Sequence, residues 1–222
     1  MSDDIIDILL KGTGETLYMV TLSTIIALII GIPIGVLLVV TDKGGVIPLL
    51  KVNKAVGTII NIIRSLPEMI LIILLLPLAR LIVGTTLGSN AAIVSLSIGS
   101  APFIARIIEN SLKEVEYGKI EAAEALGASP FEIIVKVLIP EALPSLVRGI
   151  TIAIISITGF TAIAGAIGGG GLGSLAIRFG YQRFQNDILL ATVIILVIIV
   201  QSVQIIGDII SKIINKKRFK FD

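Results

Sequence analysis

The sequence contains no cysteine and no histidine among its 222 residues. Without cysteine, the chain can form neither a disulfide framework, nor a thiolate nucleophile, nor a cysteine-based metal site. Without histidine, it cannot carry the zinc-binding HExxH motif, a Ser–His catalytic pair or a histidine proton relay. Charged residues are also scarce, at 15%, and the formal net charge of +2 does not indicate a nucleic-acid partner. The composition therefore argues against an enzyme.

What the sequence has in abundance is apolar residues. They make up 55% of the chain, and the mean hydropathy is +1.05, which is far outside the range of soluble domains. A chain of 23.4 kDa cannot hide so many apolar side chains in its own core, so lipid must be part of its solvent. Because helices satisfy their own backbone hydrogen bonds in lipid, we expect an all-α integral membrane protein.

Five runs of mostly apolar residues are long enough to cross a bilayer, which takes about 20 residues. The predicted spans cover residues 16–40, 56–78, 89–108, 146–167 and 188–210. We expect one membrane domain over residues 13–211, preceded by an N-terminal segment, 1–12, and followed by a basic tail, 212–222. Within the N-terminal segment, Ile5–Leu10 is too short to span, so we expect it to form an amphipathic helix on the membrane surface.

Five spans place the two ends of the chain on opposite sides of the membrane, and lysine and arginine mark the cytoplasmic side. Twelve basic residues fall on one side: Lys43, Lys51, Lys54, Lys113, Lys119, Lys136, Arg148, Lys212, Lys216, Lys217, Arg218 and Lys220. Four fall on the other: Lys11, Arg80, Arg178 and Arg183. We therefore expect a cytoplasmic C-terminus, an external N-terminus, a cytoplasmic loop at 113–145 and an external loop at 168–187.

The cytoplasmic loop begins with a short predicted helix. In residues 114–126, Ile120, Ala123 and Leu126 fall on one side of a helix. Gly127 follows as a helix stop in the left-handed backbone conformation. The pattern indicates a sharp corner at Gly127.

A second short helix is predicted after this corner. It begins with a capping box, in which Ser129 is the N-cap, Pro130 is the first helical residue and Glu132 is the third. Its apolar stripe consists of Phe131, Ile134, Val135 and Leu138. Pro140 and Pro144 are expected to end it. Such an elbow either packs on the helix bundle or is held by a soluble partner.

One spacing in this loop resembles the EAA motif of the permease subunits of bacterial ABC importers. That motif runs E-A-A, three residues, G, nine residues, then I-x-L-P. Glu121, Ala122, Ala123 and Gly127 fit it, and Val137–Pro140 departs from it only conservatively. The resemblance implies that the first helix of the loop is a coupling helix, which docks in a groove of an ATPase subunit. The implied coupling residues are Glu121, Ala122, Ala123, Gly127 and Pro140.

The resemblance covers nearly the whole chain and extends to the permease subunits of D/L-methionine importers. The segments that carry it are Arg64–Pro67, Ile82–Thr85, Ala101–Arg106 and Pro140–Pro144. It implies the type I importer permease fold with five spans per subunit, a homodimer, two ABC ATPase subunits and an extracytoplasmic binding protein or lipoprotein. The implied cargo is a small amino acid, methionine, moved inward across the bacterial cytoplasmic membrane by alternating access.

The chain has no nucleotide-binding motif of its own. No GxxxxGK[ST] sequence occurs, and the glycine run at 168–173 is followed by Ser174 rather than lysine. We therefore expect ATP and Mg²⁺ to be used by a separate ATPase subunit. This chain is expected to bind no cofactor, no metal and no nucleic acid.

Four ionisable residues are predicted near the cytoplasmic ends of the second and third spans: Arg64, Glu68, Arg106 and Glu109. Ionisable groups are costly in hydrocarbon and are usually paired or functional. Two interpretations stay open. The side chains reach to the membrane surface, or they form a salt-bridged knot between the two spans.

The fourth span contains a candidate gate. The segment Phe160–Gly165 resembles the region of methionine-importer permeases whose apolar side chain closes the path on the dimer axis. This resemblance makes Ile163 the gate candidate. An isoleucine that only packs in the core would look the same in the sequence.

Two other classes of membrane protein compete with the importer interpretation. A secondary transporter or channel would need no partner, but it predicts coupling-ion residues near the centres of the spans, and these centres carry none. A membrane-embedded enzyme is disfavoured by the absence of histidine and cysteine. Co-purification separates the classes, because an importer permease brings an ATPase subunit with it.

The orientation can be tested with single cysteines, since the chain has none of its own. Cysteines placed at Lys51, Ser129 and Lys217 should be shielded from an impermeant thiol reagent in intact cells, while one at Arg178 should react. Lysis should expose the first three. Labelling of those three without lysis would contradict the arrangement with five spans and an external N-terminus.

Overall fold

The protein's structure, a computed structural model, describes residues 3–218. Every regular element within these residues is a helix. The long helices are α1 (Asp3–Val40), α4 (Ser89–Lys113), α7 (Ile139–Ala166) and α9 (Asn186–Arg218). A bent pair, α2 (Leu50–Arg64) and α3 (Glu68–Val83), supplies a fifth crossing if it counts as one span. The short elements are α5 (Tyr117–Ala125), α6 (Pro130–Glu132), the π-helix η1 (Ile133–Leu138), α8 (Gly171–Leu175) and the π-helix η2 (Ala176–Tyr181).

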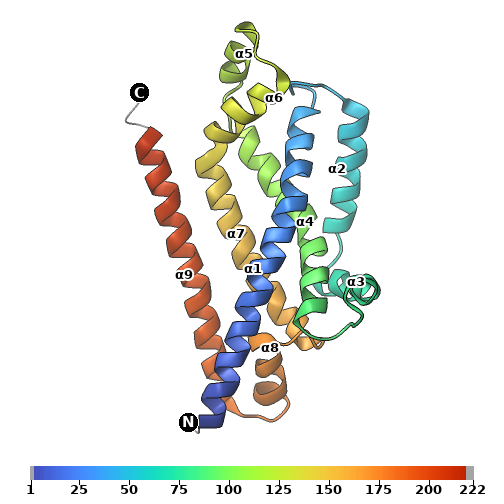
Figure 1. Ribbon diagram of the computed structural model, residues 1–222, viewed down its shortest axis with the longest axis vertical. Helices are drawn as coiled ribbons and strands as arrows, with labels where there is room; N and C mark the ends of the chain where they lie inside the picture. The colour runs from blue at the N-terminus through green and yellow to red at the C-terminus, as the bar shows by residue number, and fades with distance from the viewer. Residues whose placement is uncertain (1–2, 219–222) are drawn as a thin grey trace.

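Helices α1, α4 and α7 form the centre of the molecule, and α9 lies along one edge (Figure 1). Elements α5 and α6 lie at one end of the long axis, and the start of α1 lies at the other end, beside α8. Helices α1 and α4 run side by side in the same direction. Gly35 of α1 lies against Ala105 and Ile108 of α4, where a Cβ would come within 2.7 Å of the Ala105 carbonyl oxygen. Small residues therefore allow the close α1–α4 contact.

One apolar cluster continues from the centre of the bundle into the loop that follows α4. Its buried members are Ala27, Ile104, Ile108, Leu112, Ile120, Ile133, Leu138, Ala142, Leu146, Ala153 and Ile157. Because Ile120 lies on α5 while Ile133 and Leu138 lie on η1, the loop shares its core with the bundle. Burying one large aliphatic side chain stabilises a fold by about 1.5–3 kcal/mol relative to leaving it in water. The loop is therefore a packed part of the fold.

The two ends of the chain differ from the sequence-based expectation. Helix α1 runs without interruption from Asp3 to Val40, so the separate surface helix expected at Ile5–Leu10 is wrong. The reason is that Leu9 is buried against Leu172, Leu175 and Ile188, which hold this segment in line with the rest of α1. The expected basic tail is helical as far as Arg218. Residues 1–2 and 219–222, with Lys220, lie outside the described residues.

The segment predicted as the second span, 56–78, is not one straight helix. Helix α2 ends at Arg64, α3 begins at Glu68, and the two are bent by 105°. Pro67 explains the break, because it has no N–H to donate and disfavours the helical conformation for the preceding Leu66. Helix α3 therefore turns out of the direction of α2 (Figure 1).

The prediction that the second helix of the loop ends at Pro140 and Pro144 is wrong. One helical run continues from Pro130 to Ala166, because η1 accommodates the proline. In η1 the Ile139 N–H donates to the Ile134 carbonyl, five residues earlier, and Pro140 then occupies the first turn of α7, where no N–H is required. The wider turn directs Ile133 and Leu138, five residues apart and each 1% exposed, into the core. The apolar stripe predicted with a 3.6-residue period is therefore shifted.

The connection after α7 folds back as α8 and η2. Gly170 and Gly171 have φ angles of 86° and 74°, in the left-handed region that favours glycine. The first N–H groups of α8 are then bound by α1. Glu15 Oε2 accepts from Gly171 N at 2.7 Å, and Thr16 Oγ1 accepts from Leu172 N at 2.9 Å. These contacts satisfy donors that a helix start leaves free.

Helices α7 and α9 touch at Thr151 and Gly207, which predicts a sensitive position. A Cβ on Gly207 would lie 2.1 Å from Thr151 Oγ1, and threonine has little freedom to rotate away. We expect Gly207→Ala to destabilise the protein by about 1–3 kcal/mol, measured as a lower unfolding temperature in detergent. Combining it with Thr151→Ala should restore part of the loss. Gly14→Ala, where a Cβ meets nothing within 4 Å, is the control. An unchanged unfolding temperature for Gly207→Ala would contradict this contact.

Candidate functional site

Helix α5 ends in a Schellman motif at the corner predicted from Gly127. Gly127 has a φ of 81°. Its N–H donates to the Glu124 carbonyl at 2.9 Å, and the Ala128 N–H donates to the Ala123 carbonyl at 3.1 Å. These two bonds satisfy carbonyls that a helix end leaves free. A Cβ on Gly127 would meet nothing within 4 Å, so the backbone conformation alone favours glycine here. The predicted left-handed stop is confirmed.

The corner leads directly into the predicted capping box, which is also confirmed. The Glu132 N–H donates to Ser129 Oγ at 3.4 Å, and the Ser129 N–H donates to Glu132 Oε2 at 3.1 Å. Pro130 occupies the first helical position, and Lys136 forms an ion pair with Glu132 at 2.8 Å. Since hydrogen bonds cap both sides of Gly127, the corner has few backbone torsions left to vary. It is a stiff element.

Helix α5 is fastened to the bundle by apolar and charged contacts. Ile120 is buried in the core cluster, and the partly buried Ala123 packs against the same cluster. Lys119 Nζ lies 2.5 Å from Glu141 Oε2, which joins α5 to the first turn of α7. Of the three residues predicted on one side of this helix, Ile120 and Ala123 pack against the bundle, and Leu126 does not.

Two large apolar side chains at the corner face away from the bundle. Leu126 is 89% exposed and Phe131 is 72% exposed, although the helical periodicity places both on the apolar sides of their helices. Leu126 immediately precedes the left-handed turn, and Phe131 precedes the π-helix, so neither follows the regular periodicity of its helix. In the sequence, the feature that could have indicated their exposure is their position on either side of a capped glycine corner. Exposed apolar side chains on a stiff corner are typical of a surface that another protein covers.

The residues carried over from the EAA motif lie largely together. Glu121 and Ala122 are exposed on α5, Ala123 is half-buried beside them, and Gly127 is exposed at the corner. Pro140 lies apart, exposed in the first turn of α7 beyond η1. The structure thus brings four of these residues onto one short segment. Their part in coupling stays a prediction.

Arg106 and Glu109 form a salt bridge, but it lies within α4 and does not join the second and third spans as the knot interpretation required. Arg106 Nη1 lies 2.5 Å from Glu109 Oε2. Lys113 Nζ lies 3.0 Å from Glu109 Oε1 and 2.7 Å from Asp42 Oδ2. The hydrogen bond from Lys113 holds the pKa of the Asp42 carboxyl below its ordinary value. These four side chains form a continuous row of alternating charge.

The knot prediction is wrong for Arg64 and Glu68. Arg64 is exposed at the end of α2 and has no ion-pair partner among the described residues. Glu68 lies against Gly99, where a Cβ would be 3.5 Å from its Oε1. Since Gly99 lies in the middle of α4, the bend at Pro67 has carried Glu68 away from the expected end of the bundle. Its Oε1 is buried and has no hydrogen-bond partner among the described residues.

The gate candidate Ile163 is half-buried on α7, against a second apolar cluster. The buried members of this cluster are Met19, Ile72, Ala92, Ile93, Leu96 and Ala164. Ile163 therefore lies where α1, α3, α4 and α7 meet. Both a gate and a packing isoleucine fit this position, so its role stays a prediction.

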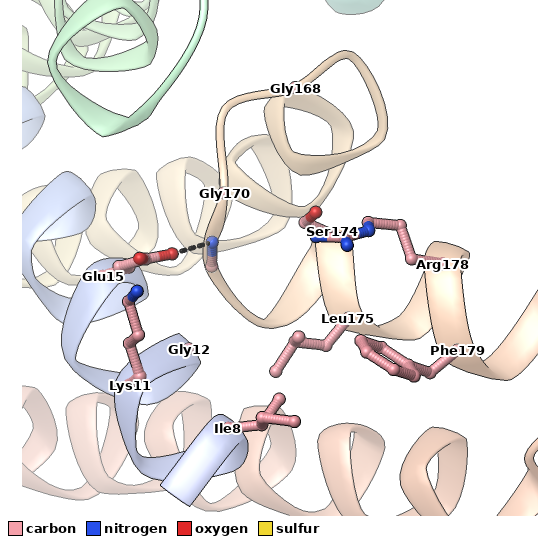
Figure 2. Close-up of a pocket in the computed structure, with 11 residues that line it drawn as sticks. Ile8, Lys11, Gly12, Glu15, Gly168, Gly170, Ser174, Leu175, Arg178 and Phe179 are labelled. Atoms are coloured by element: carbon pink, nitrogen blue, oxygen red, sulfur yellow. Dashed lines mark hydrogen bonds between the residues drawn. The ribbon is translucent and has the colours of Figure 1, made fainter.

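A pocket of about 510 Å³ opens between α1, α8 and η2, at the opposite end of the molecule from the corner. Figure 2 shows Lys11 entering from one side and Arg178 from the other. The apolar wall consists of Ile8, Leu175 and Phe179. Glu15 also lines the pocket and accepts a hydrogen bond from Gly171 N, so the charged lining consists of two cations and one carboxylate. No group of three or more acidic residues among those described could hold a metal ion. The pocket lining therefore carries one excess positive charge.

Comparison with known proteins identifies the class of chain that has these features. The family described as binding-protein-dependent transport system inner membrane component matches residues 31–220. The methionine import system permease protein MetP of Bacillus subtilis (strain 168) is 50% identical over 207 residues, 93% of each chain. The probable D-methionine transport system permease protein MetI of Vibrio cholerae is 46% identical over 202 residues, 91% of this chain and 90% of the relative.

A solved structure agrees with these sequence matches. A chain in an inward-facing structure of the MetNI methionine ABC transporter superposes with a TM-score of 0.95 at 44% identity, covering 96% of this chain and 99% of that chain. The type I importer permease fold implied by the resemblance is thereby confirmed. The family match includes the corner at Gly127 and all the helices from within α1 onward. The chain belongs to the family of binding-protein-dependent transport system inner membrane components.

Proposed function

We propose that this chain is the membrane-spanning permease subunit of an ATP-driven importer that moves methionine inward across the bacterial cytoplasmic membrane. The family match supports the permease role. Relatives named for methionine transport align over about nine-tenths of the chain and support the cargo. A separate ATPase subunit binds ATP with Mg²⁺ and hydrolyses the nucleotide. This chain supplies the path and the element that couples the path to hydrolysis.

The observation that carries the proposal is the stiff corner at Gly127. A permease driven by a separate ATPase needs an element that passes on movement without bending. The corner is capped on both sides, and the Lys119–Glu141 ion pair fastens α5 to α7. It also presents the exposed side chains of Leu126 and Phe131. Stiffness together with an exposed apolar surface is what a docking element requires.

We infer that two copies of this chain act together with two ATPase subunits. ATPase subunits of this class work as symmetric pairs, and a closed two-fold assembly gives each one its own corner. The similar solved chain belongs to a whole MetNI transporter. In the single chain, only 11% of the apolar window of α9 is buried, which leaves surface for lipid and for a second copy.

On the other side of the membrane we place an extracytoplasmic binding protein or lipoprotein. The family takes its description from transport systems that depend on such proteins. The distribution of basic residues along the sequence supports a cytoplasmic corner and an external N-terminus. The pocket beside Lys11 and Arg178 would then face outward, where an acidic side chain of the binding protein can meet the two cations.

Uptake by the assembled complex tests both the class and the cargo. Labelled methionine should enter proteoliposomes that contain this chain and its ATPase subunit, with ATP trapped inside and the binding protein added outside, and unlabelled methionine should compete more strongly than other amino acids. A secondary transporter would import without the ATPase subunit. Uptake that is independent of ATP, or that ignores methionine, would overturn the proposal.

Gly127→Val should abolish coupling while the helices still insert. Valine is β-branched, and forcing an L-residue into the left-handed conformation costs about 1–2 kcal/mol, which the corner would relieve by changing shape. A Cβ at this position meets nothing within 4 Å, so the bundle should be undisturbed. We expect normal membrane levels, loss of the co-purifying ATPase subunit and loss of methionine uptake.

Matched variants separate the shape of the corner from a general effect on α5. Gly118→Val is the same change within α5, at a position with no positive φ and no atom within 4 Å of the added Cβ, and it should keep uptake. Gly127→Asn should keep part of the uptake, because asparagine tolerates the left-handed region. Ala123→Asp, which adds a charge where α5 meets the core, should fail like Gly127→Val. If Gly127→Val binds the ATPase subunit and transports normally, the corner is not the coupling element.

Ile163→Ala tests the gate. If Ile163 closes the path, its truncation should raise the ATP-independent leak of methionine from proteoliposomes or raise ATP hydrolysis without uptake. Ile93→Ala is the control, because Ile93 is buried in the same cluster and its loss creates a comparable cavity. Lower stability without leak in both variants would show that Ile163 only packs.

A further inference from the structure

We propose that four charged side chains at the end of α4 transmit movement of the coupling corner to α2. These side chains are Asp42, Lys113, Glu109 and Arg106, named here the ionic chain. The inference rests on the proposed function, since the movement begins at the ATPase subunit. It assigns α2 as the helix that the movement reaches.

The ionic chain has no gap. Its links measure 2.7 Å from Asp42 to Lys113, 3.0 Å from Lys113 to Glu109 and 2.5 Å from Glu109 to Arg106. The Glu109 side chain is only 7% exposed, and each of its two carboxylate oxygens has a cationic partner. Removing one partner of a buried ion pair leaves an uncompensated charge. The ionic chain therefore resists separation of Glu109 from Arg106 and Lys113.

Its two ends are attached to different elements. Arg106 Nη2 donates to the Gly57 carbonyl at 3.1 Å and to Asn61 Oδ1 at 2.8 Å, and both acceptors lie on α2. Lys113 is the last residue of α4, and only residues 114–116 separate it from α5. Asp42 lies in the turn between α1 and α2. A displacement of α5 thus acts on Lys113 and reaches α2 from two directions.

Helix α2 is held to the bundle mainly by polar contacts. Ile60 is the single buried side chain described for it. Asn53 Nδ2 donates to the Leu38 carbonyl at 2.6 Å and to Thr41 Oγ1 at 3.2 Å, in addition to the contacts from Arg106. An apolar crevice of about 250 Å³ separates α2 from α1 and α4. Its lining consists of Val56, Ile59, Ile60 and Ile63 of α2, Ile30 and Ile34 of α1, and Ile98, Ala101 and Pro102 of α4. Few apolar contacts oppose a shift of α2.

A shift of α2 would also reach the centre of the bundle. Helix α2 continues through the bend into α3. On α3, Leu71 packs against Gly99 of α4, and Ile72 belongs to the cluster that contacts Ile163. The ionic chain therefore lies on a continuous path of contacts from the coupling corner to the gate candidate.

Lys113→Met tests the ionic chain, because it removes two ion pairs and keeps a long side chain. The ATPase subunit should still bind, since the corner is unchanged. The number of ATP molecules hydrolysed for each methionine imported should rise severalfold, because movement of α5 would no longer be passed on through Lys113. Asp42→Asn, a milder change at a half-exposed carboxylate, should raise the same ratio. Lys113→Arg should preserve it.

Lys54→Met is the matched control. Lys54 is an exposed lysine of α2 itself and forms no ion pair among the described residues. It should leave the ratio of ATP to methionine unchanged. If Lys113→Met and Asp42→Asn also leave this ratio at the wild-type value, the ionic chain transmits no movement.

A reversible lock tests the movement of α2 directly. Ile60 and Ala105 pack in one cluster, and the chain has no other cysteine, so Ile60→Cys with Ala105→Cys can join α2 to α4. Oxidation should stop uptake without releasing the ATPase subunit, and reduction should restore uptake. Wild-type uptake by the fully oxidised pair would show that α2 does not move. Failure of the wild-type complex to import methionine would instead contradict the proposed function and not the ionic chain.

Discussion

The hydrocarbon core of a membrane offers no water to backbone N–H and C=O groups, so these groups must hydrogen-bond within the protein. The rest of this structure depends on that constraint. It explains why the described residues are almost entirely helical. Where a helix starts, stops or changes pitch, the chain supplies its own partner. Backbone groups that are buried outside the spans need partners as well. Glu15 and Thr16 bind the first N–H groups of α8, and the π-helical turn before Pro140 carries one helix past a missing donor. The departures from regular helix are therefore built features.

The corner at Gly127 meets a different requirement, because it must be stiff although it is exposed to water. Its stiffness comes from local hydrogen bonds around Gly127, and its attachment comes from the core it shares with the bundle through Ile120, Ile133 and Leu138. A force on α5 thus acts on α4 and α7 together. The same division leaves Leu126 exposed, because its place beside the left-handed turn prevents it from joining that core.

Features of the fold that depend on near neighbours were predictable from the sequence. The apolar runs, the glycine stop and the capping box each need only a few adjacent residues, and the structure has them. Features that depend on distant neighbours were not predictable. The rule that proline ends a helix fails at Pro140, since core packing and a π-turn oppose it. The bend at Pro67 moved Glu68 away from its expected partners. Asp42, between α1 and α2, forms an ion pair with Lys113 of α4, and no local sequence pattern predicts such a pair.

Two kinds of contact distinguish helices α1 and α4, which are packed closely, from helix α2, which is held mainly by polar groups. Helices α1 and α4 are fixed by close backbone packing at Gly31 and Gly35, where even a small shift would cause a clash. Helix α2 is positioned mainly by hydrogen bonds and by the ionic chain. Buried ion pairs add little net stability, because desolvation offsets their attraction, but they fix geometry over a few ångströms. Helix α2, held in this way, keeps a defined position and can shift without disrupting the apolar core. On the proposed path, α4 therefore contacts α2 through charged and polar side chains and α1 through small residues.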